Sequence, residues 1–570
     1  MSRVFSSAST KVPRIGVNKR IGRFAVVAVV FLLGTASLAW TLRGHDATGF
    51  FFGRPGITTR WSIFGGDQTS PPAAFSPFET TSAFSPVSHT SDTSNASIAD
   101  LCASFPHYLT QQRIQPVLKM GHGENRATIK AQFASVSACF SPDELLVFSD
   151  LPEDPIPHGN GHRAIDLLAT LPASYRESWE EEKEKEEPSP DGTAKAKQTR
   201  KPKPNPDLLN YDRLTSLSRA GQLTPDNDPA RGRAGWALDK YKFLAGVERA
   251  WAMRPRRDFY VFYETDTYVA WDSLFRLLSA LDPAAPLYLG SPSPGRRDAE
   301  RAVDTWFANG GPGFVLSRGA MKRLLERRAV GEAGQFVEEP LALRWGELLK
   351  RDPCGDSVLG WALWHAGVKL SGLFPLFNVY AASGLPYTER LWCQPFVTMH
   401  KLSAGDMVRL WRWENARRTL GRPLLYRDLF DFLPVAVDEV RENWDNTVWD
   451  RLAPGEVIFV GDVDTCRQAC RDRKSCFQWH YQGNDTRRCV LMRFVSHGAA
   501  KEPEIVQTKV PVAERVGRRD GRPEGDQQFK LVEQRLTYTS GWVKSRISRW
   551  VESHRCAAPE WVSPSIERHY

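Results

Sequence analysis

An apolar strand that ends in two carboxylates is the feature that most constrains the fold of this chain. The stretch runs Tyr260-Val-Phe-Tyr-Glu-Thr-Asp-Thr-Tyr268. Glu264 and Asp266 are two residues apart, so an extended backbone places both side chains on the same side. Paired oxygen ligands at the end of a buried strand are what a hard divalent cation requires. The alternative is structural, with the acids capping a helix that begins near Trp271.

A glycine-rich loop follows further along the chain and leads into a second apolar strand. It reads Phe307-Ala-Asn-Gly-Gly-Pro-Gly-Phe-Val-Leu-Ser-Arg318. Gly310 and Gly311 would let the backbone approach a bound ligand where a Cβ atom would collide. A plain tight turn is the alternative interpretation of the same glycines.

The surrounding pattern predicts an α/β fold. A strand over 114–119, a helix over 125–138 and a strand over 145–150 form a βαβ unit, which implies a parallel sheet. Ligands of such sheets lie beyond the carboxyl ends of the strands, where Asp150 is found. Further along, the expected elements are helices over 236–249 and 271–281 and strands over 259–263, 287–290 and 314–316.

The positive charge of the chain is concentrated at its N-terminus. The formal net charge is +9 at pH 7, and six of these charges come from lysines and arginines in 1–23, a stretch without acids. The remainder is close to balanced, so the composition gives no support for binding nucleic acid.

An uncharged stretch over 24–42 is long enough to cross a bilayer core as a helix. Because its basic flank is N-terminal, the positive-inside rule predicts a cytosolic tail over 1–23, with everything after the span in the lumen. A signal peptide, cleaved after the small residues at the end of the stretch, is the alternative.

The chain beyond the span divides into three regions. Residues 43–100 are rich in Ser, Thr, Pro and Gly without a sustained period, which predicts a stem. A large globular domain is expected over 101–450. It is interrupted at 177–207 by an acidic run followed by basic residues and prolines. A solvated, disordered insertion is favoured there over a docking site.

The C-terminal region, 455–570, is expected to be a second, cysteine-stapled module. Its closely spaced cysteines are Cys466, Cys470, Cys476 and Cys489. In a luminal compartment cysteines form disulfides, so two disulfides are favoured over a zinc site. Four cysteines allow three pairings, among which the sequence does not choose.

Several of these pieces, in order, resemble the fringe-like glycosyltransferases of family 31, which include β1,3-galactosyl- and N-acetylglucosaminyltransferases. The motifs are Val117-Leu-Lys-Met-Gly121, Phe148-Ser-Asp150, Glu264-Thr-Asp-Thr-Tyr268, Asn309-Gly-Gly-Pro-Gly313 with Leu316-Ser-Arg318, Cys354-Gly-Asp-Ser-Val-Leu-Gly360 and Phe396-Val-Thr-Met-His400. The resemblance covers residues 110–405. It implies a GT-A fold, with a nucleotide-sugar-binding mixed sheet, in a single-pass type II Golgi membrane protein whose catalytic part is luminal.

The resemblance also implies a metal site. The Glu-Thr-Asp triplet resembles the family's DxD motif, which binds Mn²⁺ (or Mg²⁺) and through it the diphosphate of a UDP-sugar. Because the triplet begins with Glu, Asp266 is expected to be the main ligand, while Glu264 reaches the ribose or a metal-bound water. His400 resembles the histidine that supplies a further ligand. A packed, hydrogen-bonded histidine is the alternative.

Asp356 resembles the acid that acts as general base in inverting members, taking a proton from the acceptor hydroxyl. An N-cap of the helical run that follows is the other interpretation, and the two are compatible. Asp150 resembles a position that faces the uridine, with a solvated loop acid as the alternative. Gly310 and Gly311 are expected beside the donor or acceptor sugar.

The cysteine module resembles a PAN/apple domain, a type known for binding protein or carbohydrate. The resemblance rests on the four cysteines and on the Phe477-Gln-Trp core.

Two more disulfides are expected in the catalytic part, Cys102 with Cys139 and Cys354 with Cys393. Cys556 is then left free or available for an intermolecular bond.

Together these features predict a Golgi type II glycosyltransferase that moves a sugar from a UDP-sugar to a glycan or glycoprotein acceptor. The expected reaction inverts the anomeric carbon and forms a β1,3 linkage, with a donor that no residue identifies. One alternative is a catalytically inactive luminal carbohydrate-binding protein on the same scaffold. Another is a secreted adhesion protein released by signal cleavage.

Overall fold

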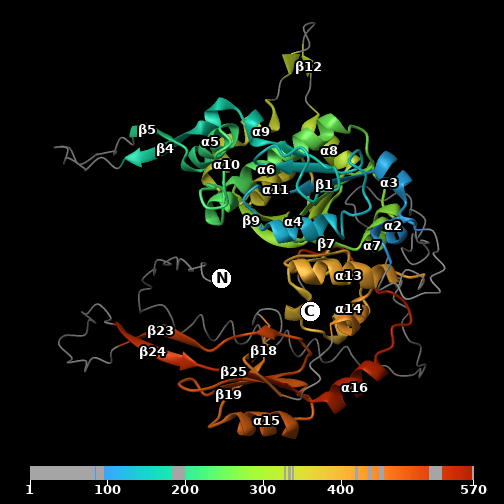
Figure 1. Cartoon of the computed structure of the whole chain (residues 1–570), viewed down its shortest axis with the longest axis vertical. Coiled ribbons are helices and arrows are strands. Elements are labelled where there is room, and N and C mark those ends of the chain that lie inside the picture. Colours follow the sequence, from blue (N-terminus) through green and yellow to red (C-terminus); the bar gives the residue numbers. More distant parts are fainter. Residues whose placement is uncertain are drawn as a thin grey trace, which may run out of the picture. The chain divides into compact units, whose positions relative to one another are not determined.

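The computed structural model describes residues 84, 96–182, 199–326, 329–330, 335–336, 339–416, 421–433, 440–448, 455–511 and 529–567 (Figure 1). All of them belong to one compact unit, Arg60–Tyr570. The expected cytosolic tail, the membrane span and most of the stem lie outside the described residues. Within the described ranges, no helix is long and apolar enough to cross a membrane.

A seven-stranded mixed sheet lies at the centre of the N-terminal part, in the order β14-β8-β11-β6-β1-β2-β3. Its strands are β1 (Ile114–Lys119), β2 (Leu146–Ser149), β3 (Ala164–Asp166), β6 (Phe259–Glu264), β8 (Tyr288–Gly290), β11 (Phe314–Ser317) and β14 (Leu370–Gly372). The strands β6, β1, β2 and β3 run parallel, whereas β11 is antiparallel to both of its neighbours. The α/β class predicted from the sequence is confirmed.

Helices cover both faces of this sheet (Figure 1). They are α4 (Arg126–Phe133), α6 (Arg233–Met253), α7 (Trp271–Ser279), α11 (Gly355–His365) and α13 (Ala404–Ala416). Successive side chains of a strand point to opposite faces. Tyr260 and Phe262 of β6 therefore pack with α6 and α11, while Val261 and Tyr263 pack with α4, α7 and α13. Since β6 is buried on both faces, its side chains are apolar until Glu264 at its carboxyl end.

The expected elements of the sheet domain are present, with boundaries shifted by a few residues. One segment differs in kind. Between the strands expected over 287–290 and 314–316, the chain forms a hairpin of β9 (Pro292–Asp298) and β10 (Val303–Ala308), which the sequence did not predict. The predicted insertion, 177–207, starts and ends in paired strands, β4 (Glu177–Glu182) and β5 (Thr199–Pro204). Residues 183–198 lie outside the described ranges.

The C-terminal region contains a five-stranded sheet in the order β17-β25-β20-β21-β19. The strands are β17 (Val440–Glu442), β19 (Glu456–Phe459), β20 (Gln478–Gln482), β21 (Arg488–Met492) and β25 (Tyr538–Trp542). Helix α15 (Val463–Asp472) packs on β20 and β21. The disulfides Cys466–Cys489 and Cys470–Cys476 join helix, strand and loop, so the expected pair of disulfides is confirmed.

The disulfides outside this module match the prediction only in part. Cys102–Cys139 is present as expected. The expected pairing of Cys354 with Cys393 is wrong, because Cys393 bonds Cys556 and Cys354 is a free thiol.

The physical reason for this pairing is the path of the C-terminal tail. After α16 (Lys544–Ser553) the chain returns to the first sheet, where the Ser565 N–H donates to the Gly372 carbonyl at 2.8 Å. Within α16, the Trp550 ring packs edge-on against Trp392, with ring centroids 4.6 Å apart. The tail thus brings Cys556 to Cys393 across 163 positions of sequence.

Candidate active site

The candidate site lies where β1, β2 and β6 end together. In the parallel register Lys119 is opposite Glu264, so the last side chains of β1 and β6 are neighbours. Asp150 follows β2 directly at the same edge. This is the edge at which open α/β sheets place their ligands.

Strand pairing brings His400 to the Glu-Thr-Asp turn. β16 (Thr398–Met399) is antiparallel to β7 (Tyr268–Val269), with Met399 opposite Tyr268. His400 Nε2 consequently lies 3.2 Å from Asp266 Oδ1 and 3.9 Å from Glu264 Oε2. One ligand atom from each of these three residues falls within 4.8 Å of the others. The side chains are 16–37% exposed, so the cluster is open to solvent.

The glycine loop holds this cluster from the other side. The Thr267 hydroxyl accepts from the Glu264 N–H at 3.1 Å and donates to the Gly311 carbonyl at 2.5 Å. A Cβ on Gly311 would lie 2.2 Å from the His400 ring, so only glycine allows the loop and the imidazole to lie this close. Gly313, at φ +78°, closes the turn in a conformation that favours glycine.

The same loop holds Asp356. The Gly310 N–H donates to Asp356 Oδ2 at 2.8 Å. Two adjacent glycines thus contact the two side chains with different expected roles. Gly310 contacts Asp356, the expected base, and Gly311 contacts His400, the expected metal ligand. Asp356 lies in the first turn of α11, and Cys354 is the N-cap, so the capping interpretation of Asp356 is wrong.

The environment of Asp356 suits a proton acceptor. Burial raises the pKa of its carboxyl to about 6, against the opposing effect of hydrogen bonds from the Gly310 and Ser357 N–H groups. The negative charge of Glu264 adds to the increase. A carboxylate with this pKa is deprotonated at neutral pH yet more basic than an ordinary aspartate.

The capping interpretation of the Glu-Thr-Asp triplet is also wrong. Helix α7 begins at Trp271 with Ala270 as its N-cap, and no side chain bonds that cap.

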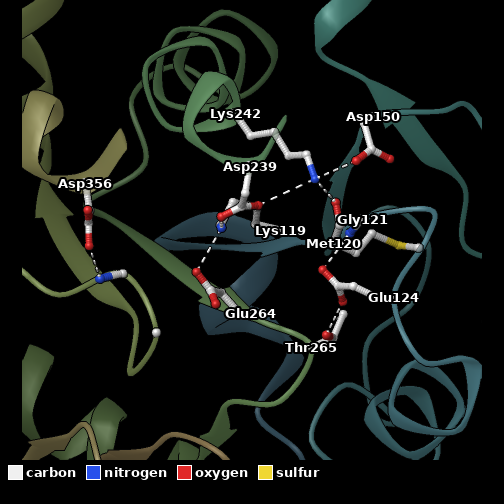
Figure 2. Close-up of polar contacts among 12 residues, drawn as sticks. Lys119, Met120, Gly121, Glu124, Asp150, Asp239, Lys242, Glu264, Thr265 and Asp356 are labelled. Carbon is white, nitrogen blue, oxygen red and sulfur yellow. Dashed lines mark hydrogen bonds and ion pairs between the residues drawn. The ribbon is translucent and has the colours of Figure 1, made fainter. Parts of the chain in front are cut away.

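Two buried lysines lie on the other side of Glu264 (Figure 2). Lys119 Nζ is 2.8 Å from Glu264 Oε1 and is also bonded to Asp239. Burial opposes the charged form of Lys119, but the carboxylates of Asp239 and Glu264 outweigh it and raise the pKa of the ammonium group. One oxygen of Glu264 is therefore held by Lys119, while the other is directed toward His400.

Lys242 neutralises the second acid of this edge. Its ammonium group is 3.0 Å from Asp150 Oδ2 and 3.5 Å from Asp239 Oδ1, and it donates to the Met120 carbonyl at 2.9 Å. Both Lys242 and Asp150 have side chains only 1% exposed. Asp150 is thus not a solvated loop acid, and that alternative is wrong. Whether it faces a uridine stays a prediction.

Glu124 holds the Glu-Thr-Asp turn in place through hydrogen bonds. It accepts from the Gly121 N–H at 2.8 Å and from the Thr265 hydroxyl. Burial raises the pKa of its carboxyl to about 7, in spite of the nearby Lys242 charge. The hydrogen bond from Thr265 fixes the residue that lies between the two predicted ligands, Glu264 and Asp266.

Four polar residues of this edge were not identified from the sequence: Lys119, Glu124, Asp239 and Lys242. Lys119 had a usable signal, since it ends a strand predicted to lie in the same parallel sheet as β6. Lys242 directly precedes an apolar helical stretch, Phe243–Val247, and an unpaired lysine beside such a stretch is disfavoured if the helix is buried. Nothing in the pattern around Glu124 or Asp239 distinguishes them from surface acids.

Residues 239–343 match the family model described as Fringe-like. This part of the chain is similar to the Fringe-like family. The Fringe-like family is one of glycosyltransferases, in agreement with the resemblance identified from the motifs. The match includes Lys242, Glu264, Asp266 and the glycine loop, whereas Asp356 and His400 lie beyond its end.

The donor set of Glu264, Asp266 and His400 fits a divalent cation. Carboxylate oxygens and a neutral imidazole nitrogen suit Mn²⁺ or Mg²⁺ better than softer metals, since no thiolate is among the clustered residues. The chain would hold such an ion through Asp266 and His400, with Glu264 Oε2 as the third donor. This assignment of ligands remains a prediction.

Proposed function

We propose that the chain is a metal-dependent, inverting glycosyltransferase that uses a UDP-sugar and a glycan or glycoprotein acceptor. One observation carries the proposal: the glycine loop connects the Glu264–Asp266–His400 cluster to Asp356. A cation-binding cluster beside a basic carboxylate is the arrangement that nucleotide-sugar transfer requires.

Each residue of the site has a distinct role in the proposed reaction. Asp266 and His400 would bind the cation. Its positive charge would offset the negative charge that develops on the departing diphosphate. Asp356 takes the proton of the acceptor hydroxyl as its oxygen attacks the anomeric carbon opposite the diphosphate. The Gly310 N–H holds Asp356 Oδ2, and the ion pair with Lys119 holds Glu264 in place.

The finer features of the proposal rest on the family resemblance. These are a β1,3 linkage, Mn²⁺ as the metal, and a Golgi type II topology with the span at 24–42. The luminal placement is supported by four disulfides among the described residues, because disulfides persist in oxidising compartments.

Release of UDP from a panel of UDP-sugars, with and without an acceptor mixture, tests the proposal. The wild type is expected to release UDP from one donor only when Mn²⁺ is present. Asp266→Ala should lose this activity, and the matched control Asp304→Ala should retain it, because Asp304 is 70% exposed on β10 away from the cluster. No release from any donor by folded wild-type protein would contradict the proposal.

The Lys119–Glu264 ion pair favours a second candidate, a carbohydrate-binding protein without transferase activity. In that case Lys119 would replace the cation as the partner of Glu264. Glycan binding that is unchanged by Mn²⁺ and by Asp266→Ala, together with absent UDP release, would support this candidate over the enzyme.

A further inference from the structure

A turn of the C-terminal module contains an acceptor triplet for N-linked glycosylation, which is Asn-X-Ser/Thr with X other than proline. The triplet is Asn484-Asp-Thr486, and it lies between the end of β20 and the start of β21. Another triplet of this kind, Asn95-Ala-Ser97, begins outside the described residues. Of the two asparagines, only Asn484 therefore has a described environment.

Asn484 is exposed, and among the described residues its side-chain amide has no hydrogen-bond partner. The two residues after it are held by hydrogen bonds. Asp485 Oδ2 accepts from the Arg535 N–H at 2.8 Å, and the Thr486 hydroxyl donates to the Gln482 carbonyl at 2.9 Å. A group attached to Asn484 Nδ2 would therefore replace no hydrogen bond of the described fold.

The backbone of the turn keeps Asn484 on the outside of the module. Asn484 has φ +58°, a left-handed conformation that asparagine adopts more readily than most residues. Gly483, just before it, is buried, and its N–H donates to the Thr537 carbonyl at 2.9 Å. The base of the turn is thus fixed to the strand that leads into β25. Exposed loop tips of this kind tolerate large additions.

N-linked glycosylation takes place in the lumen of the secretory pathway, and the module has the chemistry of that compartment. Cys489, shortly after the triplet, bonds Cys466, and Cys470 bonds Cys476. Disulfides persist in oxidising compartments. The luminal position of the module is part of the function proposed above, so the assignment of a glycan rests on that proposal.

We infer that Asn484 carries an N-linked glycan. In the transfer step an oligosaccharide moves from a lipid-linked diphosphate to Asn484 Nδ2. The bond between the anomeric carbon and the diphosphate oxygen breaks, and a bond between that carbon and Nδ2 forms. The amide gives up one proton, and the lipid diphosphate leaves. Thr486 supplies the hydroxyl side chain that the acceptor triplet requires.

Peptide mapping of the full-length protein produced in yeast tests this site. Peptide N-glycosidase converts a glycosylated asparagine into aspartate, and mass spectrometry detects the change at position 484. The wild type is expected to show this conversion only after treatment with the enzyme. An unmodified Asn484 in folded protein that has formed its disulfides would overturn the inference.

Variants of the triplet separate glycosylation from other changes at this position. Asn484→Gln and Thr486→Ala should each abolish the modification. Thr486→Ser is the matched control and should retain it, because serine preserves both the triplet and a hydroxyl for the Gln482 carbonyl. Thr486→Ala also covers the case in which glutamine at φ +58° prevents folding. Conversion at 484 that persists in Thr486→Ala would indicate deamidation and overturn the inference.

Protease protection distinguishes failure of this inference from failure of the proposed function. If added trypsin spares the C-terminal module in intact microsomes, the module is luminal, and an unmodified Asn484 then contradicts the glycan alone. If trypsin digests the module, the luminal topology and the glycan are both contradicted. A glycosylated Asn484 in protein that releases no UDP supports the inference and contradicts the transferase.

Discussion

The carboxyl edge of the main sheet carries acids in two different settings. On one side of Glu264, Asp150 and Asp239 are neutralised by Lys242 and Lys119 in a buried network. On the other side, Asp266 and Asp356 have no lysine within ion-pair distance among the described residues, and Asp266 is open to solvent beside His400. Glu264 belongs to both settings, with one oxygen on Lys119 and the other directed toward His400.

This difference separates acids that stabilise the fold from acids available for chemistry. A buried ion pair with full hydrogen bonding is costly to break, since removing one partner leaves an uncompensated charge. A carboxylate held only by backbone N–H groups keeps its basicity and can accept a proton. Activity and stability are therefore expected to respond to different substitutions.

The largest effect is expected for Asp356→Asn. The amide cannot accept the acceptor proton, so kcat should fall by about 10²–10⁴-fold. For the wild type, kcat/KM should rise with pH through about 6, where the carboxyl loses its proton. Steady-state transfer rates across pH 5–8 measure both. A variant with more than a tenth of the wild-type rate would show that Asp356 is not the base.

Lys242→Met should act on stability instead. It leaves Asp150 without its buried cation, while Asp239 keeps Lys119, and this is expected to lower the free energy of unfolding by about 3–5 kcal/mol. Combining it with Asp150→Asn should recover part of the loss.

Urea denaturation measures the effect of Lys242→Met, and Lys322→Met provides the control. Lys322 forms a surface pair with Glu326 at 3.7 Å and should change stability by about 0–1 kcal/mol. An unfolding curve for Lys242→Met that matches this control would mean that the lysine network does not stabilise the sheet edge.

Gly311→Ala should weaken metal binding without unfolding the protein. Its Cβ would meet the His400 ring at 2.2 Å, so the imidazole must move away from Asp266. Displacing a ligand in this way is expected to cost about 10–100-fold in Mn²⁺ affinity. Gly405→Ala is the matched control, because nothing lies within 4 Å of a Cβ at that position. Equal Mn²⁺ affinity in the two variants would argue against His400 as a ligand.

The smallest effect is a pH-dependent gain in stability for Asp356→Asn. The folded-state pKa of Asp356 is raised, so its contribution to stability is present at low pH and is lost as pH rises through about 6. Relative to the wild type, the variant should gain on the order of 1 kcal/mol between pH 5 and pH 7.5. Thermal melts at both pH values would contradict this if the gain were absent or reversed.

The sequence predicted the apolar strands and the acids that end them, because burial and charge leave local patterns. It predicted β6 and the two carboxylates at its end, Glu264 and Asp266. The motif resemblance added His400 and Asp356. Their convergence on one glycine loop could not be derived locally, since it depends on the pairing of β16 with β7.

Other features could not be predicted from the sequence, because they depend on residues far apart in the chain or on an unusual local composition. The β9–β10 hairpin begins with Pro292 and contains Pro294 and Gly295, residues that normally indicate a loop. The Cys393–Cys556 disulfide depends on the path of the tail after α16. The two lysines could be recognised as buried only once the helix α6 had been placed over the sheet.

Electron paramagnetic resonance with Mn²⁺ tests the central claim most directly, that Glu264, Asp266 and His400 form one metal site. The wild type should bind one Mn²⁺ per chain, more tightly in the presence of UDP, and the variant Asp266→Asn/His400→Ala should lose this binding while keeping its melting temperature. Asp304→Asn should bind as the wild type does. Mn²⁺ binding that persists unchanged in the double variant, or is absent from the folded wild type, would contradict the account.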